Sequence, residues 1–317
     1  MECPVVVHEG QKLNKMAAIG QKWVPLYQVD AFTDQPFGGN AAAVCLLGDE
    51  PQELTDDHLQ KIAAEMNQSE TAFICKLSPQ DDFISSSVFR LRWFTPVSEM
   101  LLCGHATLAS AGALFYVIKN PSSQLTFQTL SGDLFARREG DFISLDLPEN
   151  KSQPQDGGKY KDLIKATIGS FPVQEVRFCS SVGGDLLIRI PDSITREQFE
   201  KMTPDIQGMM AAHQEEIRGV IVTLKGSLEN GCVDDEGVQY DFVSRFFDPW
   251  SGLPEDPVTG SAHTVLASYW AKELGKTEFY ARQCSQRGGV LRVRLRGDGR
   301  VDVKGQAVVV TTGKIRI

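Results

Sequence analysis

The strongest constraint on the fold of this chain is that two of its parts repeat each other in order and spacing. RWFTP at residues 92–96 has a counterpart in RFFDP at 245–249. CGHATLAS at 103–110 has a counterpart in TGSAHTVLAS at 259–268. Matches in the same order, at an offset of roughly 145 to 157 residues, are the signature of an internal duplication. The chain is therefore expected to fold as two similar halves.

The segments around these matches show the same pattern of elements in both halves. Residues 27–47 and 173–192 each have the pattern of two strands joined by a glycine-containing turn. Nearly unbroken runs of apolar and small residues at 106–117 and 262–274 predict one buried helix in each half. We expect an α+β fold of two pseudo-symmetric halves, each with a barrel-like, mostly antiparallel sheet around a central helix.

The duplication also sets the predicted boundaries. The first half spans residues 26–150 and the second spans 151–317, and the first half can also receive the last C-terminal strand. Proline and glycine in KSQPQDGGKY at 151–160 are typical of a linker between the halves. Residues 1–25 lie outside the repeated patterns and are interpreted as an N-terminal extension that can be disordered.

The composition limits the partners that the chain can have. A net charge of −9 gives no general attraction to nucleic acid or to an anionic membrane. No apolar stretch is long enough to span a bilayer. The seven cysteines are scattered without a CxxC pair, which suits a reducing cytosol and disfavours disulfides or a zinc site. We expect a cytoplasmic protein that binds a small molecule, with a nuclear pool and protein partners left open.

No motif for a cofactor is present in the sequence. There is no GxGxxG motif after a strand, no P-loop, and no group of histidines at metal-ligand spacing. We therefore expect neither a nucleotide, a flavin nor a metal ion as a cofactor.

Gly104 and Gly260 stand at the start of the two predicted buried helices. Unpaired N–H groups and the helix dipole make such a start a place where a carboxylate can bind. For one motif alone, a glycine that only lets the chain turn is the simpler interpretation. Two such starts, brought together by the symmetry of the halves, favour an anion-binding site between them. Ser261 is interpreted as the cap of the second helix and as a substrate contact.

Four segments in this order carry a resemblance to a known family: DAFTDQPFGGNAAAV, EMNQSETAFI, RWFTPVSEMLLCGHATLAS and EDPVTGSAH. From about residue 26 to the end, the chain resembles the phenazine-biosynthesis isomerase family, PhzF. The resemblance implies the diaminopimelate epimerase-like fold and a homodimer. It also implies a cofactor-independent isomerase that moves a proton on a small carboxylate-bearing substrate.

The resemblance also implies roles for particular residues. Glu70 in SETAF matches the general acid/base of the family, and His105 and Asp256 match further catalytic positions. The matching substrate-binding positions are Gly39, Asn40, Gly104, Gly260 and Ser261. Without the resemblance, the favoured interpretations are a solvated loop carboxylate for Glu70 and a core or capping residue for His105, and Asp256 could be a turn residue. Ala41 departs from the proline that often follows the asparagine in the family.

The residues before the two helix starts differ in chemistry. Related epimerases of this fold use one cysteine from each half, but here Cys103 precedes Gly104 whereas Thr259 precedes Gly260. A threonine hydroxyl is too weak an acid to replace a thiol, so racemisation by this pair is disfavoured. A single acid/base, Glu70, is expected to remove and return the proton. Cys103 is interpreted as a small, buried and inert residue.

Two other functions remain open at this stage. The chain can be an amino-acid racemase or epimerase that uses Glu70 with a different partner. It can also be a non-catalytic ligand-binding or regulatory protein that keeps the cavity, because a fold and a family do not fix a reaction.

Overall fold

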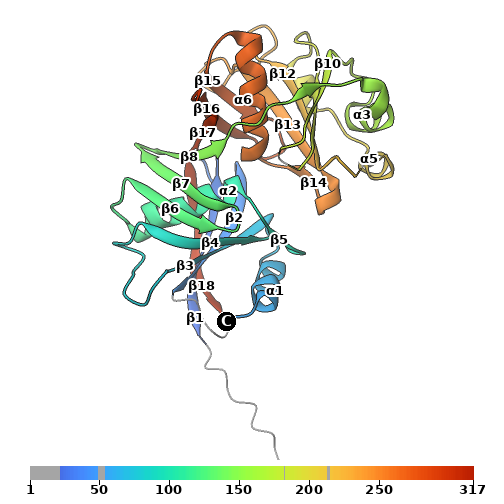
Figure 1. The fold of residues 1–317 in the computed structure, drawn as a ribbon. Coiled ribbons are helices and arrows are strands. Elements are labelled where there is room, and N and C mark those ends of the chain that lie inside the picture. The colour runs from blue at the N-terminus through green and yellow to red at the C-terminus, as the bar shows by residue number, and fades with distance from the viewer. Residues whose placement is uncertain (1–21, 49–53, 182, 213–214) are drawn as a thin grey trace, which may run out of the picture.

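A computed structural model of the chain describes residues 22–48, 54–181, 183–212 and 215–317 (Figure 1). No helix in this part of the chain is long and apolar enough to cross a membrane. Of the predicted N-terminal extension, residues 1–21 lie outside the described residues. Strand β1 already begins at Trp23, so the folded part starts before the predicted residue 26.

The two halves contain strands, short helices and one central helix each. The elements of the first half are β1 (Trp23–Ala31), β2 (Asn40–Gly48), α1 (Asp56–Met66), β3 (Glu70–Cys75), β4 (Val88–Phe94), β5 (Glu99–Met100), α2 (Gly104–Gly112), the π-helical η1 (Ala113–Ile118), β6 (Gln124–Thr129), β7 (Gly132–Glu139) and β8 (Phe142–Pro148). The elements that follow are β9 (Gln153–Pro154), η2 (Gly157–Tyr160), α3 (Lys161–Ile168), β10 (Glu175–Cys179), β11 (Asp185–Arg189), α4 (Arg196–Glu200), α5 (Ile206–Ala211), β12 (Gly219–Lys225), β13 (Phe242–Asp248), η3 (Pro249–Ser251), β14 (Leu253–Asp256), α6 (Gly260–Leu274), β15 (Glu278–Gln283), β16 (Gly289–Leu295), β17 (Arg300–Gly305) and β18 (Ala307–Arg316).

Strand pairing repeats between the halves. In the first half, β1–β2 and β3–β4 are antiparallel, whereas β2–β3 and β4–β6 are parallel. The second half has the same sequence of pairs: β10–β11 and β12–β13 are antiparallel, and β11–β12 and β13–β15 are parallel. In both halves two further antiparallel pairs follow, β6–β7–β8 and β15–β16–β17. The predicted α+β fold of two pseudo-symmetric halves is confirmed.

Three strand pairs join the two halves. β8 pairs with β17, from Ile143 with Gly305 to Pro148 with Arg300. β18 then returns to the first half and pairs with β1 along its whole length, as the red strand beside the blue one shows in Figure 1. The short β9 pairs with β10 in the corresponding place. The strand after each half thus pairs with the first strand of the other half.

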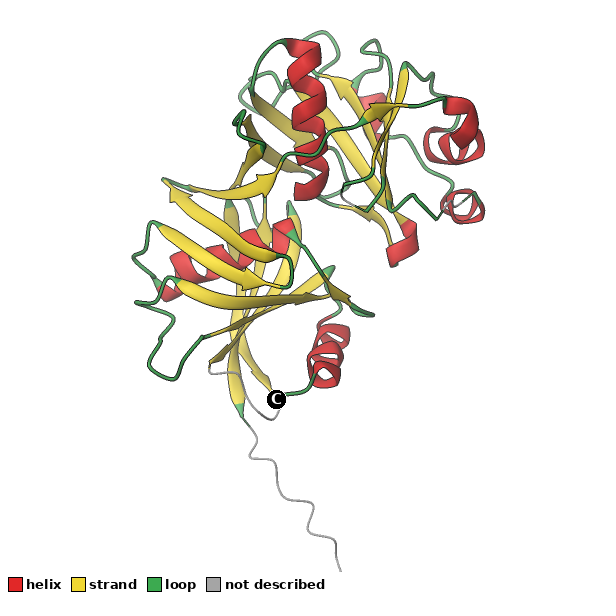
Figure 2. Ribbon diagram, viewed as in Figure 1, coloured by secondary structure: helices red, strands yellow, loops and turns green. Residues whose placement is uncertain are grey.

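The central helices are buried because their residues are small. In α2, every residue from His105 to Gly112 is buried, and a Cβ at Gly112 would lie only 2.9 Å from the Cβ of Ala307. The hydroxyls of Thr107 and Ser110 donate to carbonyls one turn back, so they can be buried without losing their hydrogen bonds. Figure 2 shows one long central helix in each half lying against strands, which matches the two predicted buried helices.

The structure predicts that β18 stabilises the half in which it lies, although it follows the other half in sequence. A chain that ends at Gly305 loses the β1–β18 ladder, at about 1 kcal/mol for each backbone hydrogen bond. Hydrogen exchange should therefore speed up in β1 and β2 while β11–β13 stay protected. Equal loss of protection in both halves would contradict this assignment.

Candidate active site

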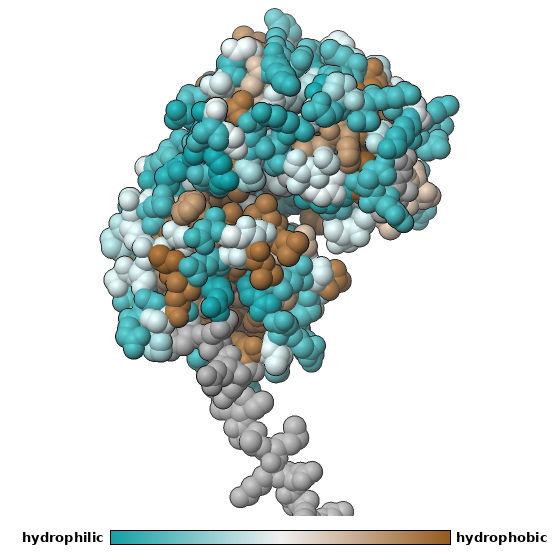
Figure 3. All heavy atoms as spheres, viewed as in Figure 1, coloured by the Kyte–Doolittle hydropathy of each residue, from teal (hydrophilic) through white to brown (hydrophobic). Residues whose placement is uncertain are grey.

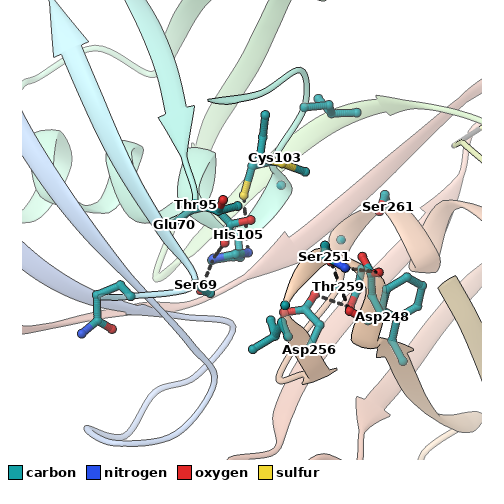
Figure 4. A pocket seen from close by; sticks show the side chains of 18 of the residues that line it. Ser69, Glu70, Thr95, Cys103, His105, Asp248, Ser251, Asp256, Thr259 and Ser261 are labelled. Atoms are coloured by element: carbon teal, nitrogen blue, oxygen red, sulfur yellow. Dashed lines mark hydrogen bonds and ion pairs between the residues drawn. The ribbon is translucent and has the colours of Figure 1, made fainter. Parts of the chain in front are cut away.

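A cavity of about 230 Å³ lies between the two halves and is lined by both. In the view of Figure 3 the second half, at the top, is largely hydrophilic, whereas apolar groups gather on the first half below the junction. Figure 4 shows two groups of polar side chains on opposite sides of the cavity. Glu70, Cys103 and His105 lie on the first-half side, and Asp256 and Thr259 lie on the second-half side.

The N-termini of α2 and α6 meet at the bottom of this cavity. A Cβ built at Gly104 would lie 3.4 Å from the Cα of Gly260, and one built at Gly260 would lie 3.5 Å from the Cα of Gly104. The N-cap residues are Cys103 and Thr259, and neither side chain makes a capping hydrogen bond. The first N–H groups of both helices therefore lack a side-chain cap beside the cavity, as a carboxylate site requires.

Ser261 differs from its prediction in one respect. It is not the cap of α6, because that position belongs to Thr259 and Ser261 is the second helical residue. Its hydroxyl still lines the cavity, so it remains in place to contact a substrate.

Glu70 is the first residue of β3 and its side chain is only 13% exposed. Its Oε2 lies 3.0 Å from Nε2 of His105, near enough for an ion pair. Apart from this ion pair, no hydrogen bond to Oε2 comes from the described residues. Burial opposes the charge on Glu70, but the attraction of His105 outweighs it and holds the pKa of Glu70 below its ordinary value. The result is an ionised carboxylate whose buried Oε2 is paired with His105 alone among the described residues.

His105 lies between Glu70 and Cys103. Its Nδ1 is 3.5 Å from the Sγ of Cys103, and its Nε2 is 3.1 Å from the Oγ of Ser69. Burial opposes protonation of the ring, yet Cys103 and Glu70 together raise the pKa of His105 well above its ordinary value. Burial raises the pKa of the Cys103 thiol to about 11, with Glu70 adding to the effect. At neutral pH the thiol is therefore protonated, and Glu70 is the charged partner of the imidazolium.

These three side chains are also the ones in the described residues that could hold a metal ion. Their ligand atoms lie within 4.8 Å of one another. We interpret the cluster of Glu70, Cys103 and His105 as a proton-transfer group, because the imidazole already bridges the carboxylate and the thiol through its two nitrogens.

Asp256 belongs to a hydrogen-bonded network on the other side of the cavity. Its carboxylate accepts hydrogen bonds from Asn40 Nδ2 at 2.7 Å and from the Thr259 hydroxyl at 2.5 Å. Burial raises the pKa of Asp256 to about 6; the charge of His105 opposes this and that of Glu70 adds to it. Asp256 thus lines the cavity as a carboxyl group that titrates near neutral pH.

Gly39 and Asn40 do not line the cavity, unlike the other predicted site residues. Asn40 is buried behind it, where its Oδ1 accepts from the Ser69 hydroxyl and its Nδ2 donates to Asp256. Gly39 has a φ of 59°, and a Cβ there would lie 2.1 Å from the carbonyl oxygen of Ala31. The structure therefore gives Asn40 a positioning role and makes Gly39 a requirement of the turn.

Arg218 is a cavity-lining residue that the sequence analysis missed. Its Nη2 donates to both carboxylate oxygens of Asp185, at 2.8 and 2.9 Å, and lies 3.5 Å from the Ser261 hydroxyl. Its guanidinium carbon is 5.3 Å from the ring centre of Phe246. Asp185 is fully buried, and burial raises its pKa to about 6 despite the attraction of Arg218. Aligning the halves would have been a usable signal, because Arg218 directly precedes β12 as Ser69 precedes β3.

The fold is of the epimerase-like class. The structure of a hydroxyproline epimerase from Agrobacterium vitis has the same fold, with a TM-score of 0.51 over 93% of this chain and 92% of that one at 15% identity. The structure of a PhzF family protein from Enterococcus faecalis is more similar, with a TM-score of 0.76 and 34% identity over 93% of this chain and all of that one.

The sequence matches the family described as "Phenazine biosynthesis-like protein" over residues 29–313, and the chain belongs to this family. A "Phenazine biosynthesis-like domain-containing protein" of Rattus norvegicus is 53% identical, over 92% of this chain and 99% of the relative. An "Uncharacterized isomerase" of Halalkalibacterium halodurans is 42% identical, over 92% of this chain and 98% of the relative. These likenesses support a function of the isomerase or epimerase type.

The raised pKa of Asp256 predicts a pH dependence of stability. Asp256 holds its proton more tightly in the folded protein, so the free energy of unfolding should fall as the pH rises from 3.8 to about 6. Urea unfolding of wild type and Asp256→Asn at several pH values checks this, with the difference between the two isolating Asp256 from Asp185. Parallel pH profiles for the two proteins would contradict the assignment.

Proposed function

We propose that this protein is a cofactor-independent isomerase in which Glu70 moves a proton on a small carboxylate-bearing substrate. The observation that carries the proposal is the state of Glu70. Its carboxylate lines the cavity, and its buried Oε2 is ion-paired with His105 and has no other hydrogen-bond donor among the described residues. A carboxylate in that state is available to accept a proton.

The surroundings of Glu70 suit removal of a proton from carbon. The pair with His105 keeps the carboxylate ionised in a buried place where little water competes for it. Glu70 takes the proton from an sp³ ring or allylic carbon and returns it at a conjugated position. Holding the substrate so that both carbons lie near the base supplies much of the rate, because orientation replaces random encounter.

The second half supplies a place for the carboxylate of the substrate. The start of α6 offers N–H groups without a side-chain cap, and Ser261 and Arg218 line the cavity beside it. Asp185 holds the guanidinium of Arg218 in one orientation through two hydrogen bonds. Asp256, across from Glu70, is placed to bind an amine or hydroxyl group of the substrate.

A racemase or epimerase is the second candidate, because Asp256 offers a further acid/base. Its pKa is about 6 and it lines the same cavity from the other half. Glu70 and Asp256 could then act on opposite faces of one carbon. Such an enzyme would invert amino acids, whereas the isomerase would move a proton between two carbons.

Replacing Glu70 by Gln should abolish proton transfer. We expect wild type in D₂O to place deuterium on carbon of trans-2,3-dihydro-3-hydroxyanthranilate or of a small amino or hydroxy acid. Glu70→Gln should lower this rate about 10²- to 10⁴-fold, since it removes the base. NMR measures the labelled position, which separates isomerisation from inversion at an α-carbon. Glu65→Gln, an exposed position on α1, is the matched control; equal rates in wild type and Glu70→Gln would refute the proposal.

Removing Arg218 should weaken substrate binding more than turnover. We expect Arg218→Gln to raise KM for carboxylate substrates roughly tenfold to a hundredfold, the effect of losing a hydrogen bond to a charged group. In Arg218→Gln alone, the buried charge of Asp185 loses its partner. The double variant Arg218→Gln with Asp185→Asn has no such unpaired charge and is the control for this effect. A change in Tm without a change in KM would show that Arg218 serves only Asp185.

A further inference from the structure

We infer that Cys103 is a second proton-transfer residue, which donates a proton to the substrate and is coupled to Glu70 through His105. This inference rests on the proposed function, in which Glu70 both removes and returns the proton, and it assigns the second of these steps to Cys103. It also replaces the interpretation of Cys103 as an inert buried residue.

The three side chains form a continuous chain along the first-half wall. Sγ of Cys103 lies 3.5 Å from Nδ1 of His105, and Nε2 of the same ring lies 3.0 Å from Oε2 of Glu70 (Figure 4). Both ends of the chain, the thiol and the carboxylate, line the cavity. His105 therefore contacts both ends, and as an imidazolium it holds a proton on Nδ1 that it can give to the sulfur when the thiol has lost its own.

Packing alone does not account for this arrangement. The other described cysteines, at positions 45, 75, 179, 232 and 284, are also buried, but none of them lines this cavity. The equivalent N-cap in the second half is Thr259, whose hydroxyl donates to Asp256 instead of reaching toward a histidine. The contact of Cys103 with an imidazole is therefore particular to the half that carries Glu70.

A second proton donor would remove a geometric problem of a reaction in which one base must reach two carbons. Burial and the ion pair with His105 restrain Glu70, whereas a proton shift requires action at two different carbons. A thiol on the same wall provides a proton at a second position without movement of the carboxylate. A shift on one face of the substrate is then possible with both groups fixed.

The steps balance without an oxidant or a reductant. Glu70 takes a proton from the first carbon, which leaves a conjugated carbanion and a carboxylic acid. Cys103 then donates its thiol proton to the second carbon, so that an S–H bond breaks, a C–H bond forms and a thiolate remains. His105, an imidazolium at the start, gives its Nδ1 proton to the sulfur and becomes a neutral ring that keeps its proton on Nε2. Once the product has left, Glu70 releases its proton to water and Nδ1 takes one up from water, so all three groups regain their starting states.

Isotope exchange in the complete chain tests the inference. Wild type, Cys103→Ala, Cys103→Ser and Glu70→Gln are each incubated in D₂O with trans-2,3-dihydro-3-hydroxyanthranilate. NMR follows two rates: exchange of the proton that Glu70 removes, and formation of the isomer. A serine hydroxyl keeps the size of the thiol but is a far weaker acid. Cys179→Ala, a buried cysteine away from the cavity, is the matched control.

We expect both Cys103 variants to keep the exchange and to form the isomer about 10²- to 10⁴-fold more slowly. Cys179→Ala should leave both rates as in wild type. Isomer formation at the wild-type rate in Cys103→Ala would overturn the inference, and so would an equal fall of both rates in Cys103→Ser.

The same experiment separates this inference from the proposed function. If wild type exchanges, Glu70→Gln does not, and the Cys103 variants form the isomer at the wild-type rate, only the inference fails. If wild type neither exchanges nor isomerises, or if Glu70→Gln exchanges like wild type, the proposed function fails and the inference fails with it.

Discussion

The close contact between Gly104 and Gly260 is the constraint on which the rest of the site depends. A Cβ built on either glycine would already be in van der Waals contact with the Cα of the other, so the two helix starts lie directly against each other. Two buried helices can therefore point their N-termini at one place, from opposite sides of the junction between the halves. The cavity, its uncapped N–H groups and the opposition of Glu70 to Asp256 all follow from that approach.

Duplication produced two copies of one site, and the copies have diverged in chemistry. Equivalent positions in the two halves are Asn40 and Asp185, Ser69 and Arg218, Cys103 and Thr259, and His105 and Ser261. The first half keeps an acid/base group, in which an imidazole joins a carboxylate and a thiol. The second half has an arginine fixed by a buried aspartate, with a serine beside it. Under the proposed function, a substrate between them meets proton-transfer groups on one side and anion-binding groups on the other.

The sequence predicted the features that depend on local patterns and on the repeat. The two buried helices and the pseudo-symmetric halves followed from runs of small residues and matched motifs. Long-range packing decided the rest. Arg218 reaches the cavity only because β11 pairs with β12, two strands that are distant in sequence. Gly39 is required by a tight turn against the carbonyl of Ala31 and not by a contact with the cavity. The apolar run of the first central helix also gave no indication that α2 continues as the π-helix η1.

A crystal structure with a small aromatic carboxylate such as anthranilate bound tests the central claim most directly. The claim is that the first half transfers the proton while the second half holds the anion. The account predicts the carboxylate at the start of α6, within hydrogen-bond distance of Ser261 or Arg218, and the ring facing Glu70. A carboxylate bound instead to His105, with Glu70 turned away from the ring, would contradict it.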